Sequence, residues 1–155
     1  MNCPDPLHGY YLEDLKIGMS ASFTKTITET DIVLFAGLSG DTNPLHLDAD
    51  YAAQSFFGQR VAHGMLSASL ISGVLGTRLP GPGAIYIDQH LSFIAPVHIG
   101  DTVTATVTVL EINLQRRRVK LETVCSVKGN VVMTGSATTR VTRRPSPNLP
   151  LNPSK

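Results

Sequence analysis

The chain has 155 residues, of which 42% are hydrophobic and only 16% are charged, and its formal net charge at pH 7 is +1. This length suits one domain with one core, and the near-neutral charge gives no electrostatic case for binding nucleic acid or an anionic membrane. The first residues lack the basic and apolar regions of a signal peptide, and no apolar run approaches the roughly 20 residues that span a bilayer, so we expect a cytoplasmic protein.

The first predicted elements are a strand and a helix. Serine and threonine alternate with other residues over positions 19–30, and a period of two is typical of a β-strand. Thr28 or Thr30 can then cap a helix, and early acidic residues suit its positive end. The apolar residues that follow continue this helix to Gly37 or Gly40, which ends it.

A short helix, a long helix and a run of strands make up the rest of the domain. Residues 47–58 predict the short helix, and residues 61–81 predict the long one. Two apolar stripes leave the long helix no broad polar face, so we expect it to be buried nearly all round. β-Branched segments follow from residue 84 onward, two of them joined by a hairpin turn at residues 128–130. This order predicts an α+β fold in which the long helix packs on one face of a curved antiparallel sheet.

The two ends of the chain are rich in proline and are expected to lie outside the domain. The domain is predicted to cover residues 10–143, and residues 144–155 are predicted to form a disordered tail. Cys3 and Cys125 show neither metal-binding nor disulfide spacing, so we expect two reduced thiols.

The turn SGDTNPLH, residues 39–46, gathers polar groups between two predicted helices. Pro44 fixes its own backbone and moves Asn43 out of the helical region, and the Asn43 side chain can brace the turn. Asp41 and His46 are thereby held in a set relation, and a carboxylate and an imidazole that converge could hold and deprotonate a water. The spacing alone favours a plainer interpretation, in which both are ordinary loop residues.

Gly64 follows His63 at the start of the long helix. The first N–H groups of a helix have no internal partners, and the helix dipole makes that end positive. A glycine there lets a ligand oxygen approach the backbone, which predicts a site for a carbonyl that gains negative charge. Alternatively, Gly64 only eases a tight helix entry and His63 caps the helix.

Metal, nucleotide and nucleic-acid sites have weak support in the sequence. His46 and Asp48, with the distant His98, match the pattern of facial-triad oxygenases, but Asp48 begins a helix where that motif needs strands. No dinucleotide fingerprint, P-loop or nucleophile elbow is present. Residues 116–118 are three arginines that could contact a ligand phosphate, although a solvated turn is the commoner role of such a run. We therefore expect no metal and no cofactor.

Three segments together resemble the MaoC-like (R)-specific enoyl-CoA hydratases, which have the hotdog fold. They are SGDTNPLHLDADYA, RVAHGMLSASLISGVLG and PGPGAIYIDQHLSFIAPVHIGDTV, and the resemblance runs from about residue 11 to residue 141. It implies a homodimer whose two sheets join edge to edge. It also implies hydration of trans-2-enoyl-CoA to (R)-3-hydroxyacyl-CoA without a cofactor, in a role that supplies polyhydroxyalkanoate monomers from β-oxidation.

The resemblance also implies roles for individual residues. Asp41 and His46 correspond to the catalytic pair, and the Gly64 N–H corresponds to the group that binds the thioester carbonyl. The substrate pocket is then expected to include Asn43, Ser72 and Leu75. Because Leu75 is bulky, we expect short acyl chains of roughly four to six carbons.

Two other functions stay open at this point, because one fold hosts many activities. The chain could dehydrate 3-hydroxyacyl groups on acyl carrier protein, and residues 116–118 would be its only basic docking patch. A thioesterase fits the turn less well. A non-catalytic acyl-CoA-binding module belongs to a different class and would be expected to lack the acid–base pair.

Overall fold

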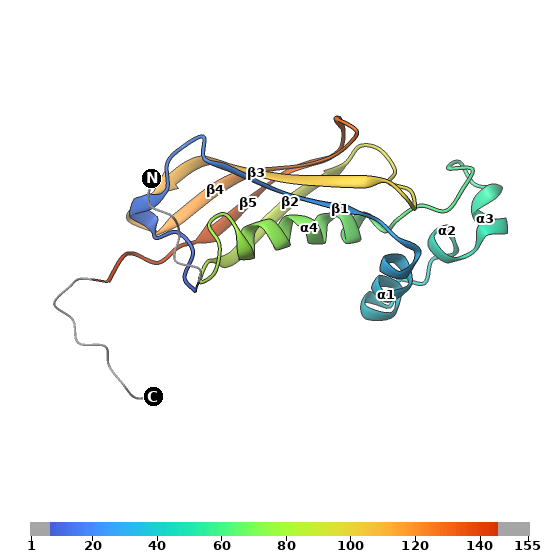
Figure 1. The fold of residues 1–155 in the computed structure, drawn as a ribbon, viewed down its shortest axis with the longest axis horizontal. Coiled ribbons are helices and arrows are strands. Elements are labelled where there is room, and N and C mark those ends of the chain that lie inside the picture. The colour runs from blue at the N-terminus through green and yellow to red at the C-terminus, as the bar shows by residue number, and fades with distance from the viewer. Residues whose placement is uncertain (1–6, 146–155) are drawn as a thin grey trace.

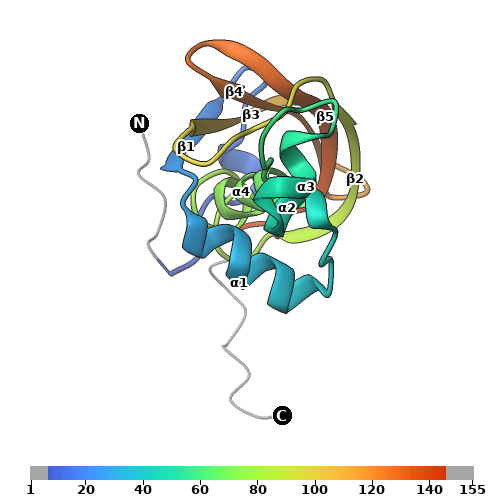
Figure 2. The same ribbon diagram turned by 90° about the vertical axis from the view of Figure 1, so that its right-hand side faces the viewer.

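The computed structural model describes residues 7–145, so nearly all of the predicted tail, residues 144–155, lies outside the described part. A curved five-stranded antiparallel sheet wraps around one long helix, as Figures 1 and 2 show from two sides. This α+β hotdog architecture confirms the predicted fold class. Among the described residues, no helix is long and apolar enough to cross a membrane.

The sheet has the strand order β1-β3-β4-β5-β2, so β1 and β2 form its two edges. The strands are β1 (Ser20–Thr26), β2 (Ile85–Phe93), β3 (Thr102–Asn113), β4 (Arg118–Val127) and β5 (Asn130–Arg140). The predicted hairpin between β4 and β5 is confirmed. Lys128 and Gly129 form its turn with φ angles of 50° and 82°, as the two-residue turn that matches strand twist requires.

Three of the helices gather at one end of the sheet, the long helix runs beneath it, and a 3-10 turn lies at the other end (Figure 1). They are the 3-10 turn η1 (Leu12–Asp14), α1 (Glu29–Ser39), α2 (Pro44–Leu47), α3 (Ala49–Ala53) and α4 (Gly64–Thr77). The single helix predicted over residues 47–58 is wrong in its bounds. Asp48 has extended backbone angles and accepts a hydrogen bond from the Tyr51 N–H, so it ends α2 and caps α3.

The predicted caps of α1 are confirmed at both ends. Thr28 and Asp31 exchange hydrogen bonds at the first turn, which satisfies two N–H groups that the helix leaves without partners. Gly40 ends the helix with a φ of 77°, a left-handed conformation that glycine adopts without strain. The chain therefore turns sharply just before Asp41.

One side of α4 packs on the concave face of the sheet and forms the core. Ile71 and Val74 are fully buried there, among apolar side chains of β3 and β4. The prediction that α4 is buried nearly all round is wrong for the single chain, because the sheet covers only one side of the helix. Its open side carries a stripe of exposed and mostly small residues: Met65, Ser69, Ser72 and Gly76.

Candidate active site

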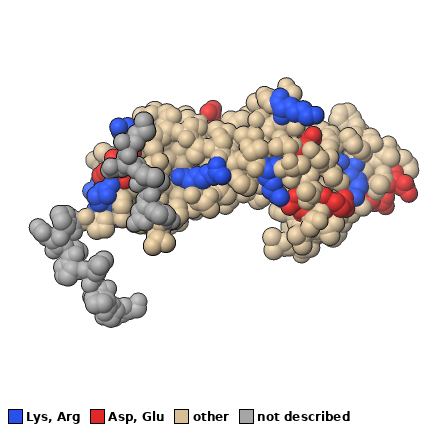
Figure 3. Space-filling view, viewed as in Figure 1, with Lys and Arg blue, Asp and Glu red and all other residues tan. Residues whose placement is uncertain are grey.

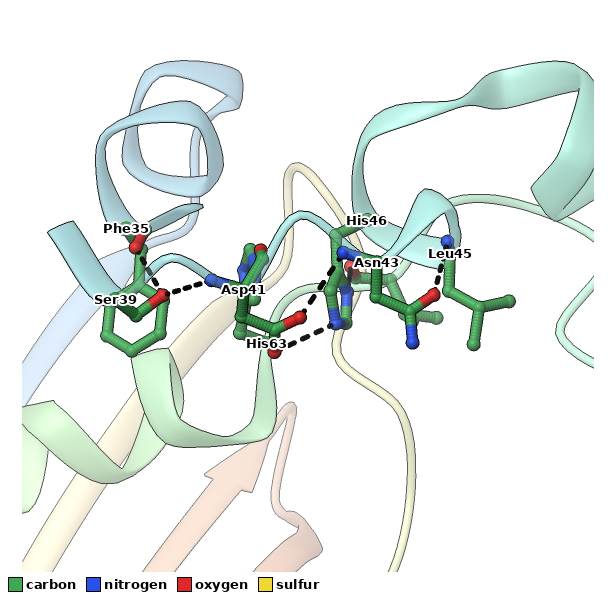
Figure 4. A network of polar contacts seen from close by, with 8 residues as sticks. Phe35, Ser39, Asp41, Asn43, Leu45, His46 and His63 are labelled. Carbon is green, nitrogen blue, oxygen red and sulfur yellow. Dashed lines mark hydrogen bonds and ion pairs between the residues drawn. The ribbon is translucent and has the colours of Figure 1, made fainter. Parts of the chain in front are cut away.

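The turn after α1 holds Asp41 through short-range hydrogen bonds (Figure 4). The Asp41 N–H donates to Ser39 Oγ at 3.2 Å, and Asp41 Oδ1 accepts from the Asn43 N–H at 3.3 Å. Asn43 caps α2 because its Oδ1 accepts from the Leu45 N–H at 3.0 Å. Pro44, at the first helical position, needs no partner for an N–H. The sequence Asn-Pro thus starts the single helical turn that carries His46.

The orientation of His46 is fixed by the strand-like segment before α4. His46 Nδ1 lies 2.7 Å from the Val61 carbonyl oxygen, and since a carbonyl only accepts, Nδ1 carries the proton. The other nitrogen, Nε2, therefore faces Asp41. Arg60 holds α2 in place by donating to the His46 carbonyl at 2.6 Å while it pairs with Glu29 of α1 through two bonds of 3.0 and 2.9 Å.

Asp41 and His46 converge without touching. His46 Nε2 and Asp41 Oδ2 are 3.9 Å apart, and the side chains are 12% and 52% exposed, respectively. That separation is too long for a direct hydrogen bond. A single water between the two atoms can bond to both, so the predicted convergence of this pair agrees with the geometry.

His63 joins this pair, and sequence reasoning missed its position. His63 is the N-cap residue of α4 by position, but its side chain makes no capping bond. Its Nε2 instead donates to the Asp41 carbonyl oxygen at 2.9 Å, and its ring lies 3.8 Å from the His46 ring between centroids. The side chain is only 1% exposed. The one signal in the sequence that could have indicated this position is that His63 directly precedes the long helix predicted to be buried.

Asp41, His46 and His63 also form a group that could be considered for a metal, because one ligand atom of each lies within 4.8 Å of the others. The His63 Nε2 proton is donated to a carbonyl, however, so that nitrogen has no lone pair for a metal, and the lone pair of this ring lies on the buried Nδ1. The facial-triad pattern is not assembled: Asp48 caps α3, and the His98 ring lies 3.6 Å from Asp101. The described cluster suits a bound water better than a metal.

A cavity of about 420 Å³ opens beside His46 and the first turn of α4. Gly64 and Ser67 of α4 line it, and most of the remaining wall is apolar, including Phe57, Val61, Phe93, Val97 and Met133. Within residues 7–145, no group accepts a hydrogen bond from the Gly64 N–H. The cavity thus combines an apolar wall with the Gly64 N–H and the imidazole of His46, one member of the acid–base pair.

The other expected pocket residues lie outside the lining of this cavity. Asn43 uses its side-chain oxygen to cap α2. Ser72 is exposed on the open side of α4, and Leu75 is 3% exposed within the core. Their contact with a substrate stays a prediction.

Comparisons with known proteins agree with this fold. The MaoC-like domain family matches residues 14–131. The (R)-specific enoyl-CoA hydratase of Rhodospirillum rubrum is 59% identical over 140 residues, which are 90% of this chain and 97% of the relative. The 3-hydroxybutyryl-CoA dehydratase of Methylorubrum extorquens is 50% identical over 134 residues, 86% of this chain and 85% of the relative.

A solved structure is similar over nearly the same range. The (R)-hydratase from Aeromonas caviae, described as involved in PHA biosynthesis, superposes with a TM-score of 0.81 and is 42% identical. The superposition covers 83% of this chain and 98% of the hydratase. With the family match across most of the domain, the chain belongs to the MaoC-like domain family.

Proposed function

We propose that the chain catalyses the reversible, (R)-specific hydration of trans-2-enoyl-CoA to (R)-3-hydroxyacyl-CoA. The observation that carries this proposal is an apolar cavity lined by His46 and Gly64, with the Asp41 carboxylate 3.9 Å from His46 Nε2. The (R)-specific hydratase and the 3-hydroxybutyryl-CoA dehydratase among its relatives support the same chemistry.

The first step would add water to C3 of the enoyl thioester. Asp41 takes a proton from the water while its oxygen bonds to C3, and His46 Nε2 fixes the direction of attack. The C2=C3 π electrons move toward the thioester carbonyl, which gains negative charge. The Gly64 N–H stabilises that charge, since a helix N-terminus offers both a donor and a positive dipole.

The second step returns a proton to C2. The proton that Asp41 accepted passes back from the Asp41–His46 pair, so that water has been added as a proton and a hydroxyl and no other reactant is consumed. Delivery from one pair on one side of the substrate gives syn addition. The two groups share a water and act as a unit.

We propose short acyl chains and a role in supplying polyhydroxyalkanoate monomers. A cavity of about 420 Å³ lies at the low end of the range for small-molecule sites. The relative named for 3-hydroxybutyryl-CoA and the neighbour described as involved in PHA biosynthesis support these assignments. The arginines at residues 116–118 lie at the far end of β3 and β4 from Asp41 within one chain, so they give no support to a carrier-protein substrate (Figure 1).

We also propose that the active form is a cytoplasmic homodimer joined along β2. This edge strand and the loop after it expose large apolar side chains, with Ile85, Phe93 and Ile94 each more than half exposed. Figure 3 shows the opposite face, on the side of β1, where Lys and Arg (blue) and Asp and Glu (red) are scattered over the surface. A second copy on the β2 edge would cover the apolar side chains and bring its own strand against the open side of α4.

The test is turnover of crotonyl-CoA, followed by loss of the enoyl-thioester absorbance and by a coupled dehydrogenase specific for the (R)-product. The wild type should form the (R)-product. Asp41→Asn should fold normally and lose turnover by a factor of at least about a hundred, and His46→Ala should behave similarly. Asp50→Asn, which removes an exposed carboxylate of α3, is the matched control and should keep the wild-type rate.

Three outcomes would contradict the proposal. An (S)-product would overturn the stereochemistry, and wild-type turnover in Asp41→Asn would remove Asp41 from the mechanism. Activity on acyl-carrier-protein thioesters with none on any enoyl-CoA would replace the proposed carrier.

A further inference from the structure

The side chain of His63 is buried in a way that packing does not explain. It lies between the rings of Phe35 and His46, with centroid distances of 5.0 and 3.8 Å, and is 1% exposed. Its Nδ1 is buried and has no hydrogen-bond partner among the described residues. A buried polar atom without a partner destabilises a fold, and an apolar side chain of similar shape would avoid this cost.

The other ring nitrogen of His63 makes one specific contact. Its Nε2 proton is donated to the main-chain carbonyl of Asp41 at 2.9 Å, a bond that joins residues 22 positions apart. The other bonds of the Asp41 main chain and carboxylate within the described chain run to Ser39 and Asn43, inside the same turn. His63 therefore supplies the contact that ties this turn to the start of α4.

We propose that His63 is the positioning residue that sets Asp41 and His46 against the Gly64 N–H. Because His63 directly precedes Gly64, its bond to Asp41 fixes the carboxylate relative to the helix end that receives the thioester carbonyl. Its ring also lies against the His46 ring. This contact limits tilting of the His46 imidazole about the hydrogen bond from its Nδ1 to the Val61 carbonyl. This inference rests on the proposed function, since it concerns the geometry of the same reaction.

Two substitutions separate the hydrogen bond from the packing. His63→Gln places an amide N–H near the position of Nε2, whereas His63→Met fills the space without a donor. His63→Met should lower kcat at least about tenfold with little change in KM, because a small misplacement of reacting groups lowers turnover more than binding. His63→Gln should recover most of that loss. Phe35→Leu, which loosens the other side of the ring and keeps the bond, is the control.

A measurement without substrate gives a second readout. The 15N resonances of the His46 ring should change in His63→Met and stay close to the wild type in His63→Gln and Phe35→Leu. If His63→Met keeps the wild-type kcat and the His46 resonances, while Asp41→Asn is inactive, the proposed hydration stands and the inference about His63 is overturned. Equal loss in His63→Met and His63→Gln would also overturn it. If the wild type hydrates no enoyl-CoA, the proposed function fails and the resonances alone decide whether His63 positions His46.

Discussion

Gly64 lies where the cavity meets the first turn of α4, and its lack of a side chain leaves room for the Phe93 ring. A Cβ added at Gly64 would lie 2.7 Å from Phe93 Cε1, closer than van der Waals contact allows. The atoms that this Cβ would meet belong to the end of the Phe93 side chain and not to backbone, so the ring can shift to admit a methyl group. A substitution at Gly64 therefore changes the cavity without breaking the backbone.

Gly64→Ala should leave the thermal unfolding midpoint within a few degrees of the wild type and lower kcat/KM at least about tenfold. The added methyl group displaces Phe93 and crowds the N–H proposed to bind the thioester oxygen. Gly37→Ala is the matched control, because it also lies in a helix and a Cβ there meets nothing within 4 Å. Unchanged kcat/KM in Gly64→Ala would argue against carbonyl binding at this N–H.

Residues that belong to one local motif could be recognised from the sequence, and His63 could not. Asp41, Asn43 and His46 lie within one short turn, so proline and asparagine chemistry indicated their arrangement. The role of His63 depends on a hydrogen bond that spans 22 positions. Ser72 and Leu75 were assigned through family resemblance, and neither lines the cavity of the single chain.

At the scale of elements, local caps explain why α1 was predicted well and the following helices were not. Thr28 and Gly40 are strong start and stop signals that lie at the ends of α1 as expected, and Asp31 adds a capping bond to Thr28. The break between α2 and α3 depends on Asp48, whose side chain can either extend a first turn or cap a new helix. The structure has the second arrangement, since Asp48 accepts from the Tyr51 N–H.

Asp31→Asn tests the start of α1. Burial alone would raise the pKa of Asp31, but hydrogen bonds from Thr28 and the nearby Lys25 ammonium hold this pKa below its ordinary value of 3.8. The charged form thus stabilises the folded state above pH 3.8, and this contribution is lost as the pH falls through the lower folded-state pKa. At pH 7, Asp31→Asn should lower the free energy of unfolding by about 1 kcal/mol.

Denaturant titrations at several pH values provide the measurement. The difference between the wild type and Asp31→Asn should be constant near neutral pH and shrink in strongly acidic solution. Asp50→Asn, in the first turn of α3, should cause a smaller change. A difference that persists at the lowest pH would show that the amide disrupts the cap for steric reasons.

For the whole molecule, the open side of α4 and the free edge of β2 are the features that a single chain does not explain. The prediction that α4 is buried nearly all round placed the helix at the centre of one chain, whereas the sheet covers only one of its sides. Polar residues on the β2 edge indicate how a second copy would align. Asp88 and His90 pair with Thr138 and Ser136 of β5, and Gln89, between them, pairs with the buried Ala137.

Two copies of β2 that run antiparallel about Gln89 would place each Asp88 opposite His90 of the second copy. Moving the axis to Asp88 would oppose two carboxylates, and moving it to His90 would oppose two imidazoles. Opposite charges across strands stabilise a pair and like charges destabilise it. Glu122 and Lys120 of β4 project on the same side of the sheet as Ser136 and Thr138, so they add both signs of charge nearby. The pattern therefore favours an axis at Gln89.

Single cysteines test this axis in a Cys3→Ser background, where the remaining Cys125 is buried. In the proposed alignment, the two Gln89 Cα atoms lie about 4.5–5.5 Å apart, within the reach of a disulfide. A shift of the axis by one residue separates them by about 6.7 Å more along the strand, beyond that reach. Gln89→Cys should therefore form a disulfide-linked dimer on oxidation, and Asp88→Cys and His90→Cys should not. If Asp88→Cys or His90→Cys forms the cross-linked dimer instead, the axis lies at that residue and not at Gln89. If the protein sediments as a monomer at micromolar concentration, the proposed dimer is contradicted.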